Sequence, residues 1–286
     1  MRILVVGSTG TIGNQLSTYL SQNGVEVLAT SRHTTLDKNC LHLDLADISA
    51  VVDVIKKQKK FDGAVLCAAV TNLRECERNP EVTSQININS QVTLAESLLQ
   101  VGTKRVVCLS SNRVFDGKSA NTNKFAQYSY TTEYGRQKAE AETELLKLGQ
   151  AVRIIRFTKV FSETNSLLTD WVSKLKSGQE IEAFVDVMVS PVTLDDAVRV
   201  IAEVVESESE SVTQFSATDQ ISYFDVARFV ANFLEVNTSL VVAQSAEEVG
   251  EAPLEHASLE CSEFKSVDPS SSIVALRKVL EKIVSS

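Results

Sequence analysis

The fold is decided by the stretch Arg2-Ile3-Leu4-Val5-Val6-Gly7-Ser8-Thr9-Gly10-Thr11-Ile12-Gly13 at the start of the chain. Residues 3–6 form an apolar run of the kind found in buried parallel strands. Three glycines follow, and Ile12, Leu16 and Leu20 then recur at the spacing of one helix face. The stretch therefore predicts a strand, a tight turn and a helix, which is how a βαβ unit begins.

The same alternation of apolar runs and amphipathic stretches continues through the first half of the chain. Strands that alternate with helices predict a parallel sheet joined by right-handed crossovers, so we expect a doubly wound α/β fold. The expected strands are 25–30, 41–43, 64–69, 105–109 and 152–155, and the expected helices run from Asp47 to about Lys60, over 89–100 and over 133–148.

The glycine turn has the properties of a phosphate-binding loop, with the spacing G-x-x-G-x-x-G. Gly7 would permit the sharp turn, Gly10 would let the backbone approach a pyrophosphate, and Gly13 would let the helix pack on the strand. The N-terminus of the following helix offers free N–H groups and a partial positive charge. Three glycines alone indicate only a tight turn, but their place at the first β–α junction favours dinucleotide binding.

The second half of the chain is less regular. Helices are expected near 167–176, 194–205, 223–235 and 272–284, with short strands between them. There is no internal repeat and no low-complexity linker. We therefore expect residues 1–160 to form an NAD(P)-binding domain, and residues 161–286 to form mainly a smaller α/β lobe that packs on it and is interwoven with it.

The end of the second expected strand favours NADPH over NADH. NAD sites usually carry an Asp or Glu there, which binds the ribose 2′-hydroxyl, and this chain has Thr30, Ser31 and Arg32 instead. Ser31 can hydrogen-bond a 2′-phosphate and Arg32 can pair with it. The alternatives are that Arg32 is a solvated loop residue and that NADH is used. Asp44 would accept a hydrogen bond from the adenine amino group or simply close a turn.

Three residues suggest carbonyl reduction. Tyr134 and Lys138 are four positions apart and lie on one helix face, while Ser111 follows the fifth strand at the ligand-binding edge. A nearby ammonium and a positive nicotinamide would lower the tyrosine pKa from about 10. Tyr134 would then protonate a carbonyl oxygen as hydride arrives, with Ser111 bonding the same oxygen. Because Y-x-x-x-K alone is common on helix surfaces, this interpretation depends on the combination with the glycine loop.

In order and spacing, the glycine loop, Ser111 and Tyr134-x-x-x-Lys138 resemble the extended short-chain dehydrogenase/reductase family. Within it, Leu109-Ser110-Ser111-Asn112-Arg113-Val114-Phe115-Asp116-Gly117 is similar to the dTDP-4-dehydrorhamnose reductase branch, which typically reads S-T-D-Y-V-F-D-G. Further similar segments are Ala68-Ala69, Ile86-Asn87, Ser190-Pro191-Val192-Thr193 with Asp195-Asp196-Ala197, and His256-Ala257-Ser258-Leu259-Glu260.

This resemblance covers nearly the whole chain. It implies a Rossmann-type domain with a smaller C-terminal substrate lobe, and reduction of a keto group on a nucleotide sugar with NAD(P)H. Ser111, Tyr134 and Lys138 take the catalytic positions. The expected cofactor contacts are Gly7, Thr9, Gly10, Thr11, Ile12, Gly13, Ser31, Arg32, Asp44, Leu45, Ala68, Ala69, Tyr134 and Lys138.

The chain departs from the branch at the expected substrate pocket. Arg113 stands where the branch has Tyr, Lys159 stands where it often has Trp, and the loop 118–132 lacks the usual acidic and proline residues. Because both cations follow strands that end at one edge, we expect them, with Asn112, near the nicotinamide. A substrate with an additional carboxylate or phosphate near its carbonyl would follow. The alternative is that both cations point to solvent or pair with acidic neighbours such as Asp116 and Glu163.

Two other functions remain open. An epimerase or dehydratase on the same scaffold would keep NAD bound, and the segment 30–32 counts against NAD. A non-catalytic NADP-binding regulator is the other alternative, since the regulatory subunit of methionine adenosyltransferase resembles the same branch.

Composition excludes several classes of partner. The 286 residues carry 28 basic and 37 acidic side chains, a net charge of −9, which argues against nucleic acid and membrane surfaces as partners. Five cysteines without a C-x-x-C pair suggest reduced thiols in a cytoplasmic protein, and three histidines without ligand spacing predict no metal site. No apolar run is long enough to cross a bilayer, and the N-terminus lacks the anatomy of a signal peptide. The oligomeric state stays open, with a homodimer as one alternative.

Overall fold

A central parallel sheet of seven strands organises the computed structural model, which describes residues 1–33, 39–206, 208 and 210–285. The strand order is β11-β6-β5-β4-β1-β2-β3, so it reverses between β1 and β4. Sheets of this kind bind ligands at the carboxyl edge near that reversal. The expected doubly wound α/β fold is confirmed. The strands are β1 (Arg2–Val6), β2 (Glu26–Ser31), β3 (Cys40–His42), β4 (Gly63–Leu66), β5 (Val106–Ser111), β6 (Val152–Phe157) and β11 (Val212–Phe215).

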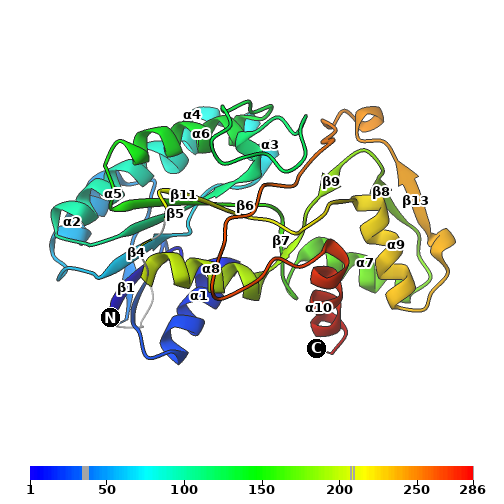
Figure 1. The fold of residues 1–286 in the computed structure, drawn as a ribbon, viewed down its shortest axis with the longest axis horizontal. Helices are drawn as coiled ribbons and strands as arrows, with labels where there is room; N and C mark the ends of the chain where they lie inside the picture. Colours follow the sequence, from blue (N-terminus) through cyan, green and yellow to red (C-terminus); the bar gives the residue numbers. More distant parts are fainter. Residues whose placement is uncertain (34–38, 207, 209, 286) are drawn as a thin grey trace.

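Helices cover both faces of this sheet (Figure 1). Alternate residues of β1 divide between two hydrophobic clusters: Ile3 and Val5 pack against α1 and α8, whereas Leu4 and Val6 pack against α2 and α5. All four side chains are buried, which explains why β1 reads as an unbroken apolar run. The helices are α1 (Thr11–Gln22) and α8 (Leu194–Glu206) on one face, and α2 (Ile48–Lys56), α5 (Ser90–Gln100) and α6 (Glu133–Leu146) on the other.

A second group of elements encloses its own hydrophobic cluster at the other end of the molecule (Figure 1). Three helices pack there around a parallel pair, β8 and β13, with two further short pairs beside them. The elements are α7 (Ser166–Lys176), α9 (Tyr223–Phe233), α10 (Ser272–Ser285), β7 (Val160–Phe161), β8 (Ile181–Phe184), β9 (Met188–Val189), β10 (Val192–Thr193), β12 (Ile221–Ser222) and β13 (Val241–Gln244).

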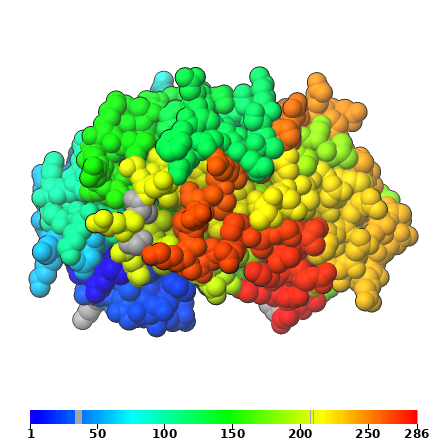
Figure 2. Space-filling view, in the orientation of Figure 1, coloured from blue at the N-terminus to red at the C-terminus, as the bar shows by residue number. Residues whose placement is uncertain are grey.

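The chain passes between these two parts more than once. After β7–β10, helix α8 and strand β11 return to the central sheet, and α9 begins again in the second part. The segment near residue 260 then runs back across the first part (Figure 2), where the amides of His256, Glu260 and Ser262 donate to the carbonyls of Gly117, Thr122 and Gln214. The division near residue 160 stays a prediction.

Several local expectations change. The carboxylate of Asp47 caps α2 as expected, but the helix ends at Lys56 rather than near Lys60. The polar run that follows offers no apolar side chain to bury before Phe61.

The region before α5 is helical, although no helix was expected there. The additional short elements are α3 (Leu73–Arg78), α4 (Pro80–Ser84), the π-helix η1 (Gln85–Asn89) and the 3-10 turns η2 (Asn112–Val114), η3 (Thr238–Leu240) and η4 (Glu247–Val249).

Candidate active site

The glycine turn lies between β1 and α1, at the carboxyl edge of the sheet. Gly7 has a φ of +83°, and a Cβ atom there would lie 2.8 Å from the Cβ atom of Ala68. A Cβ atom at Gly13 would lie 2.3 Å from the Gly7 carbonyl oxygen, so α1 closes directly on the loop. Gly10 is exposed, and no side chain caps α1 there. This uncapped helix end has the shape and free N–H groups that a phosphate needs.

The ends of β2 and β3 continue the same edge. Ser31 is buried and its hydroxyl accepts a hydrogen bond from the His33 amide at 3.0 Å, while Arg32 is exposed. Asp44 accepts from the amide of Ala46 at 3.0 Å, so it does close a turn. That bond occupies Oδ1 and leaves the second carboxylate oxygen as an acceptor for a ligand.

A cavity of about 410 Å³ opens at the carboxyl ends of β4, β5 and β6. It brings Ser111, at the end of β5, together with Tyr134 and Lys138 on α6. The second part of the molecule closes its far side with residues such as Tyr223 and Ala257. The other expected site residues on its wall are Ile12, Ala68, Ala69, Asn112, Arg113 and Lys159.

Tyr134 and Lys138 are both buried, with exposed fractions of 9% and 7%. Burial raises the pKa of Tyr134 above its ordinary value, and the Arg113 guanidinium opposes that shift. Burial lowers the pKa of Lys138, and the charges of Cys108 and Glu142 partly oppose this shift by raising it. Burial thus outweighs the opposing charge of Arg113 at Tyr134, and the expected lowering of the tyrosine pKa by an ammonium and a bound nicotinamide stays a prediction.

Close packing explains why Arg113 acts on Tyr134. A Cβ atom at Gly135 would lie 2.2 Å from the Arg113 carbonyl oxygen, so only glycine lets η2 approach α6 this closely. The Thr132 side chain caps α6 by accepting from the Gly135 amide at 3.1 Å. The helix start that carries Tyr134 is thus fixed against the residues that follow β5.

The Ser111 hydroxyl is oriented by its neighbours. It accepts from the Arg113 amide at 3.2 Å and donates to Oδ1 of Asn112 at 3.3 Å. Asn112 in turn donates to the Ala257 carbonyl at 3.0 Å, which ties the end of β5 to the segment that crosses from the second part.

A buried ion pair beneath the cavity was not expected from the sequence. Glu142 and Arg156 are each 2% exposed, and their charged groups lie 2.6 Å apart. Ser110 donates to the same carboxylate, as does the Tyr128 hydroxyl at 3.0 Å. Burial raises the pKa of Tyr128 to about 12, and the Glu142 charge adds to the shift. The signal in the sequence was Arg156, because it lies within the mainly apolar strand 152–157 and a buried cation needs a partner of opposite charge.

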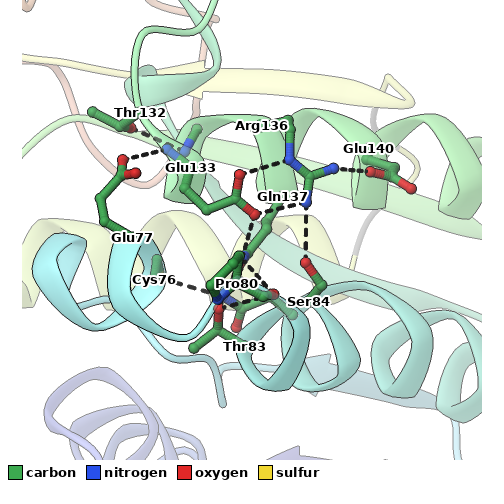
Figure 3. Close-up of polar contacts among 12 residues, drawn as sticks. Cys76, Glu77, Pro80, Thr83, Ser84, Thr132, Glu133, Arg136, Gln137 and Glu140 are labelled. Carbon is green, nitrogen blue, oxygen red and sulfur yellow. Dashed lines mark hydrogen bonds and ion pairs between the residues drawn. The ribbon is translucent and has the colours of Figure 1, made fainter.

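A second polar network fixes α6 from its other side (Figure 3). The Glu77 carboxylate accepts from the Glu133 amide at 2.8 Å, and Arg136 donates to the Ser84 hydroxyl at 3.0 Å. Below them the buried Gln137 donates to the Thr83 hydroxyl at 2.8 Å. These contacts join the helix that carries Tyr134 and Lys138 to α3 and α4.

A larger cavity of about 600 Å³ adjoins the first. Leu73, Arg113 and Tyr223 lie on the walls of both, so the two form one cleft between α3 and the second part. An exposed ion pair of 2.5 Å between Arg74 and Glu251 spans this cleft. None of these residues except Arg113 was singled out from the sequence. The larger cavity is also lined by Arg78, Trp171 and Phe184.

A family model described as the RmlD substrate binding domain matches residues 1–283. The chain belongs to this family. The resemblance to the reductase branch of the extended short-chain dehydrogenases is thereby confirmed at the level of the family. The cleft formed by the two adjoining cavities therefore lies between the two parts of a chain of this family.

Three known proteins illustrate this membership. Methionine adenosyltransferase 2 subunit beta of Danio rerio is 23% identical over 279 residues, covering 92% of this chain and 84% of its own. A dTDP-4-dehydrorhamnose reductase of Aggregatibacter actinomycetemcomitans is 24% identical over 234 residues, covering 79% and 76%. The structure of the Bacillus anthracis str. Ames dTDP-4-dehydrorhamnose reductase in complex with NADP has a TM-score of 0.86 at 19% identity and covers 98% of both chains.

Two further properties concern membranes and metals. Across the part of the chain that the structure describes, no helix combines the length and apolar character needed to span a membrane. Within those same residues, no group of three or more His, Cys, Asp or Glu side chains is arranged to hold a metal ion.

Proposed function

We propose that this RmlD-family chain is an NADPH-dependent reductase of a keto group on a nucleotide sugar. The observation that carries the proposal is the cavity that gathers Ser111, Tyr134 and Lys138 beside the glycine turn. The activity named for the Aggregatibacter relative and the NADP in the Bacillus structure support the same reaction.

The cofactor site fits the residues present. The uncapped start of α1 suits the pyrophosphate, and Arg32 beside Ser31 suits a 2′-phosphate. When bound, NADPH supplies the hydride. The residues proposed to hold it are Gly7, Thr9, Gly10, Thr11, Ile12, Gly13, Ser31, Arg32, Asp44, Leu45, Ala68, Ala69, Tyr134 and Lys138.

The chain's own residues position and protonate the carbonyl group. Ser111 donates a hydrogen bond to the carbonyl oxygen, and the Tyr134 hydroxyl gives that oxygen its proton. The charge of Arg113 stabilises the phenolate that remains, because it acts directly on Tyr134. A tyrosine hydroxyl is protonated at neutral pH, as a proton donor must be, and the charge of Arg113 opposes the raised pKa that would hinder the transfer.

The larger cavity suits the nucleotide of the substrate. Arg78 offers charge-assisted hydrogen bonds to a diphosphate, as Arg74 would on leaving Glu251, while Trp171 and Phe184 offer apolar surface to a base. Its junction with the catalytic cavity at Tyr223 would let the attached sugar reach Tyr134.

A reducing compartment such as the cytoplasm is part of this proposal. It rests on two cysteines, Cys67 and Cys108, whose thiol pKa values burial raises to about 12. Such thiols are unreactive and need no oxidising surroundings.

A regulatory protein without turnover is the second candidate. It is favoured by the 23% identity to methionine adenosyltransferase 2 subunit beta over 92% of this chain. In that case the chain would bind NADPH with the same residues and reduce nothing.

One assay separates the two candidates. The protein is mixed with NADPH and a panel of keto nucleotide sugars that includes dTDP-4-dehydrorhamnose, and the loss of NADPH absorbance is compared with the alcohol formed. We expect one alcohol for each NADPH consumed with at least one member of the panel. Tight NADPH binding without consumption by any member would reject the reductase in favour of the regulator.

Cofactor preference gives an independent test. We expect the Kd for NADPH to be at least about 10-fold below that for NADH, because a charge-assisted bond to the 2′-phosphate contributes roughly 1.5–3 kcal/mol. Arg32→Ala should remove most of this difference, whereas Lys57→Ala, an exposed cation at the end of α2, should leave it unchanged. Calorimetric titration measures both constants. Equal binding of the two cofactors by the unmodified protein would contradict the assignment.

A further inference from the structure

We propose that the sugar reduced by this chain carries a carboxylate, which Arg113 and Lys159 bind beside Tyr134. This inference rests on the proposed reductase function and adds the class of substrate.

The catalytic cavity has an unbalanced charge. Its described walls carry three cations, Arg113, Lys138 and Lys159, and no Asp or Glu side chain. This imbalance arises in a chain whose net charge is −9, so the general composition does not explain it. Like charges gathered in a concave site repel one another, and an anionic ligand relieves that repulsion.

Arg113 and Lys159 are neighbours from different strands. Arg113 lies in η2 after β5, and Lys159 lies between β6 and β7, so adjacent parallel strands deliver both to one edge. Burial lowers the pKa of each, and the charge of Arg113 lowers that of Lys159 further. Arg113 is half-buried and Lys159 is exposed to solvent, and the charge of each disfavours the charge of the other.

The neighbouring carboxylates do not neutralise them. Among the residues that the structure describes, neither cation forms an ion pair, and Asp116 lies 4.0 Å from Lys118 instead. Tyr223 and Tyr134 raise the pKa of Arg113 and so favour its charged form. Of the alternatives from the sequence, pairing with Asp116 or Glu163 is not what the described residues show, whereas Lys159 does reach solvent. A carboxylate on the substrate would supply the counter-charge that the cavity wall lacks.

The diphosphate of a nucleotide sugar does not account for both cations. Arg113 lines the catalytic and the larger cavity, but Lys159 lines only the catalytic one. The larger cavity has its own arginines, Arg74 and Arg78, beside three glutamates, of which Glu251 pairs with Arg74, and a diphosphate would compete for these arginines. The anion that Lys159 faces is therefore on the part of the substrate that enters the catalytic cavity, which is the sugar.

Size favours a carboxylate over a phosphate. The cavity of about 410 Å³ must hold the sugar ring and leave one face open to the nicotinamide. A carboxylate adds a single heavy atom to the hydroxymethyl group of a hexose, whereas a phosphate ester adds four. The planar guanidinium of Arg113 also matches a carboxylate with two parallel hydrogen bonds.

The test compares two ligands that differ only in this group. Full-length protein loaded with NADP⁺ is titrated with UDP-glucuronate and UDP-glucose, and with the corresponding dTDP sugars, by calorimetry. We expect the uronate to bind at least 10-fold more tightly, since one charge-assisted hydrogen bond is worth about that factor. Lys159→Met and Arg113→Met should each remove about 10-fold of the preference. Lys176→Met, an exposed cation on α7 outside both cavities, should change nothing.

Each other outcome has a definite meaning. Equal binding of uronate and neutral sugar, in a protein that reduces keto nucleotide sugars, overturns the carboxylate and leaves the reductase standing. UDP-glucose 6-phosphate is titrated in the same way. If it binds more tightly than UDP-glucuronate, the cations bind a phosphate, and the proposed carboxylate is overturned. If no nucleotide sugar binds or is reduced, the proposed function itself has failed. Lys159 is solvent-accessible, so Lys159→Met decides the matter even if Arg113→Met does not fold.

Discussion

Replacing Tyr134 with Phe is expected to lower kcat for ketone reduction by about 10²–10⁴, the usual contribution of a general acid. The substitution removes only the hydroxyl that carries the proton, and the ring keeps its buried place at the start of α6. The loss should therefore fall on the chemical step. Steady-state rates of NADPH oxidation, once a substrate is found, measure it directly.

Two controls make this result specific. The Kd for NADPH should stay within a few-fold, because the glycine turn and the ends of β2 and β3 are untouched. Tyr130→Phe removes the same atom from an exposed tyrosine just before α6 and should leave kcat unchanged. A Tyr134→Phe protein that works at close to the original rate would show that another group supplies the proton.

Much of this site could be predicted because its residues follow strands. The glycine turn and Lys159 follow strands and Ser111 ends one, and parallel strands place such positions at one edge. Helical spacing likewise predicts that Tyr134 and Lys138 share a face. The seventh strand, β11, could not be predicted in the same way. Its sequence Val-Thr-Gln-Phe contains no apolar run, and its pairing with β6 depends on α8 first returning the chain to the sheet.

The electrostatics of the site were harder to predict. Helical spacing indicated Lys138 as the cation beside Tyr134 but gave no sign of Arg113, which arrives through the close approach allowed by Gly135 and opposes the raised pKa of Tyr134. Such an approach depends on how η2 packs against α6, and periodicity does not contain that information. The same is true of Glu142 and Arg156, which a helix and a strand bring together only after both pack on the sheet.

Replacing Arg156 with Met should lower the free energy of unfolding by about 3–5 kcal/mol, the typical effect of removing one partner of a buried ion pair. Glu142 would then remain buried with only the hydroxyls of Ser110 and Tyr128 as donors. Arg156 also donates to Gln214 at 3.1 Å, so the contact between β6 and β11 would weaken as well. Urea unfolding followed by circular dichroism measures the change.

The double variant Arg156→Met with Glu142→Leu distinguishes an orphaned charge from lost packing. If the cost of the single change comes from an unpaired buried carboxylate, removing that carboxylate should restore most of the stability, because apolar replacement of a whole buried pair is often neutral. Arg153→Met, on the same strand, is the matched control: its guanidinium bonds backbone carbonyls instead of an acid, and we expect a loss below about 1 kcal/mol. If Arg153→Met and Arg156→Met lower the free energy of unfolding equally, the ion pair contributes no more to stability than the contacts of Arg153 with backbone carbonyls. A double variant less stable than Arg156→Met would show that the network holds β5, β6 and α6 together through packing rather than through charge.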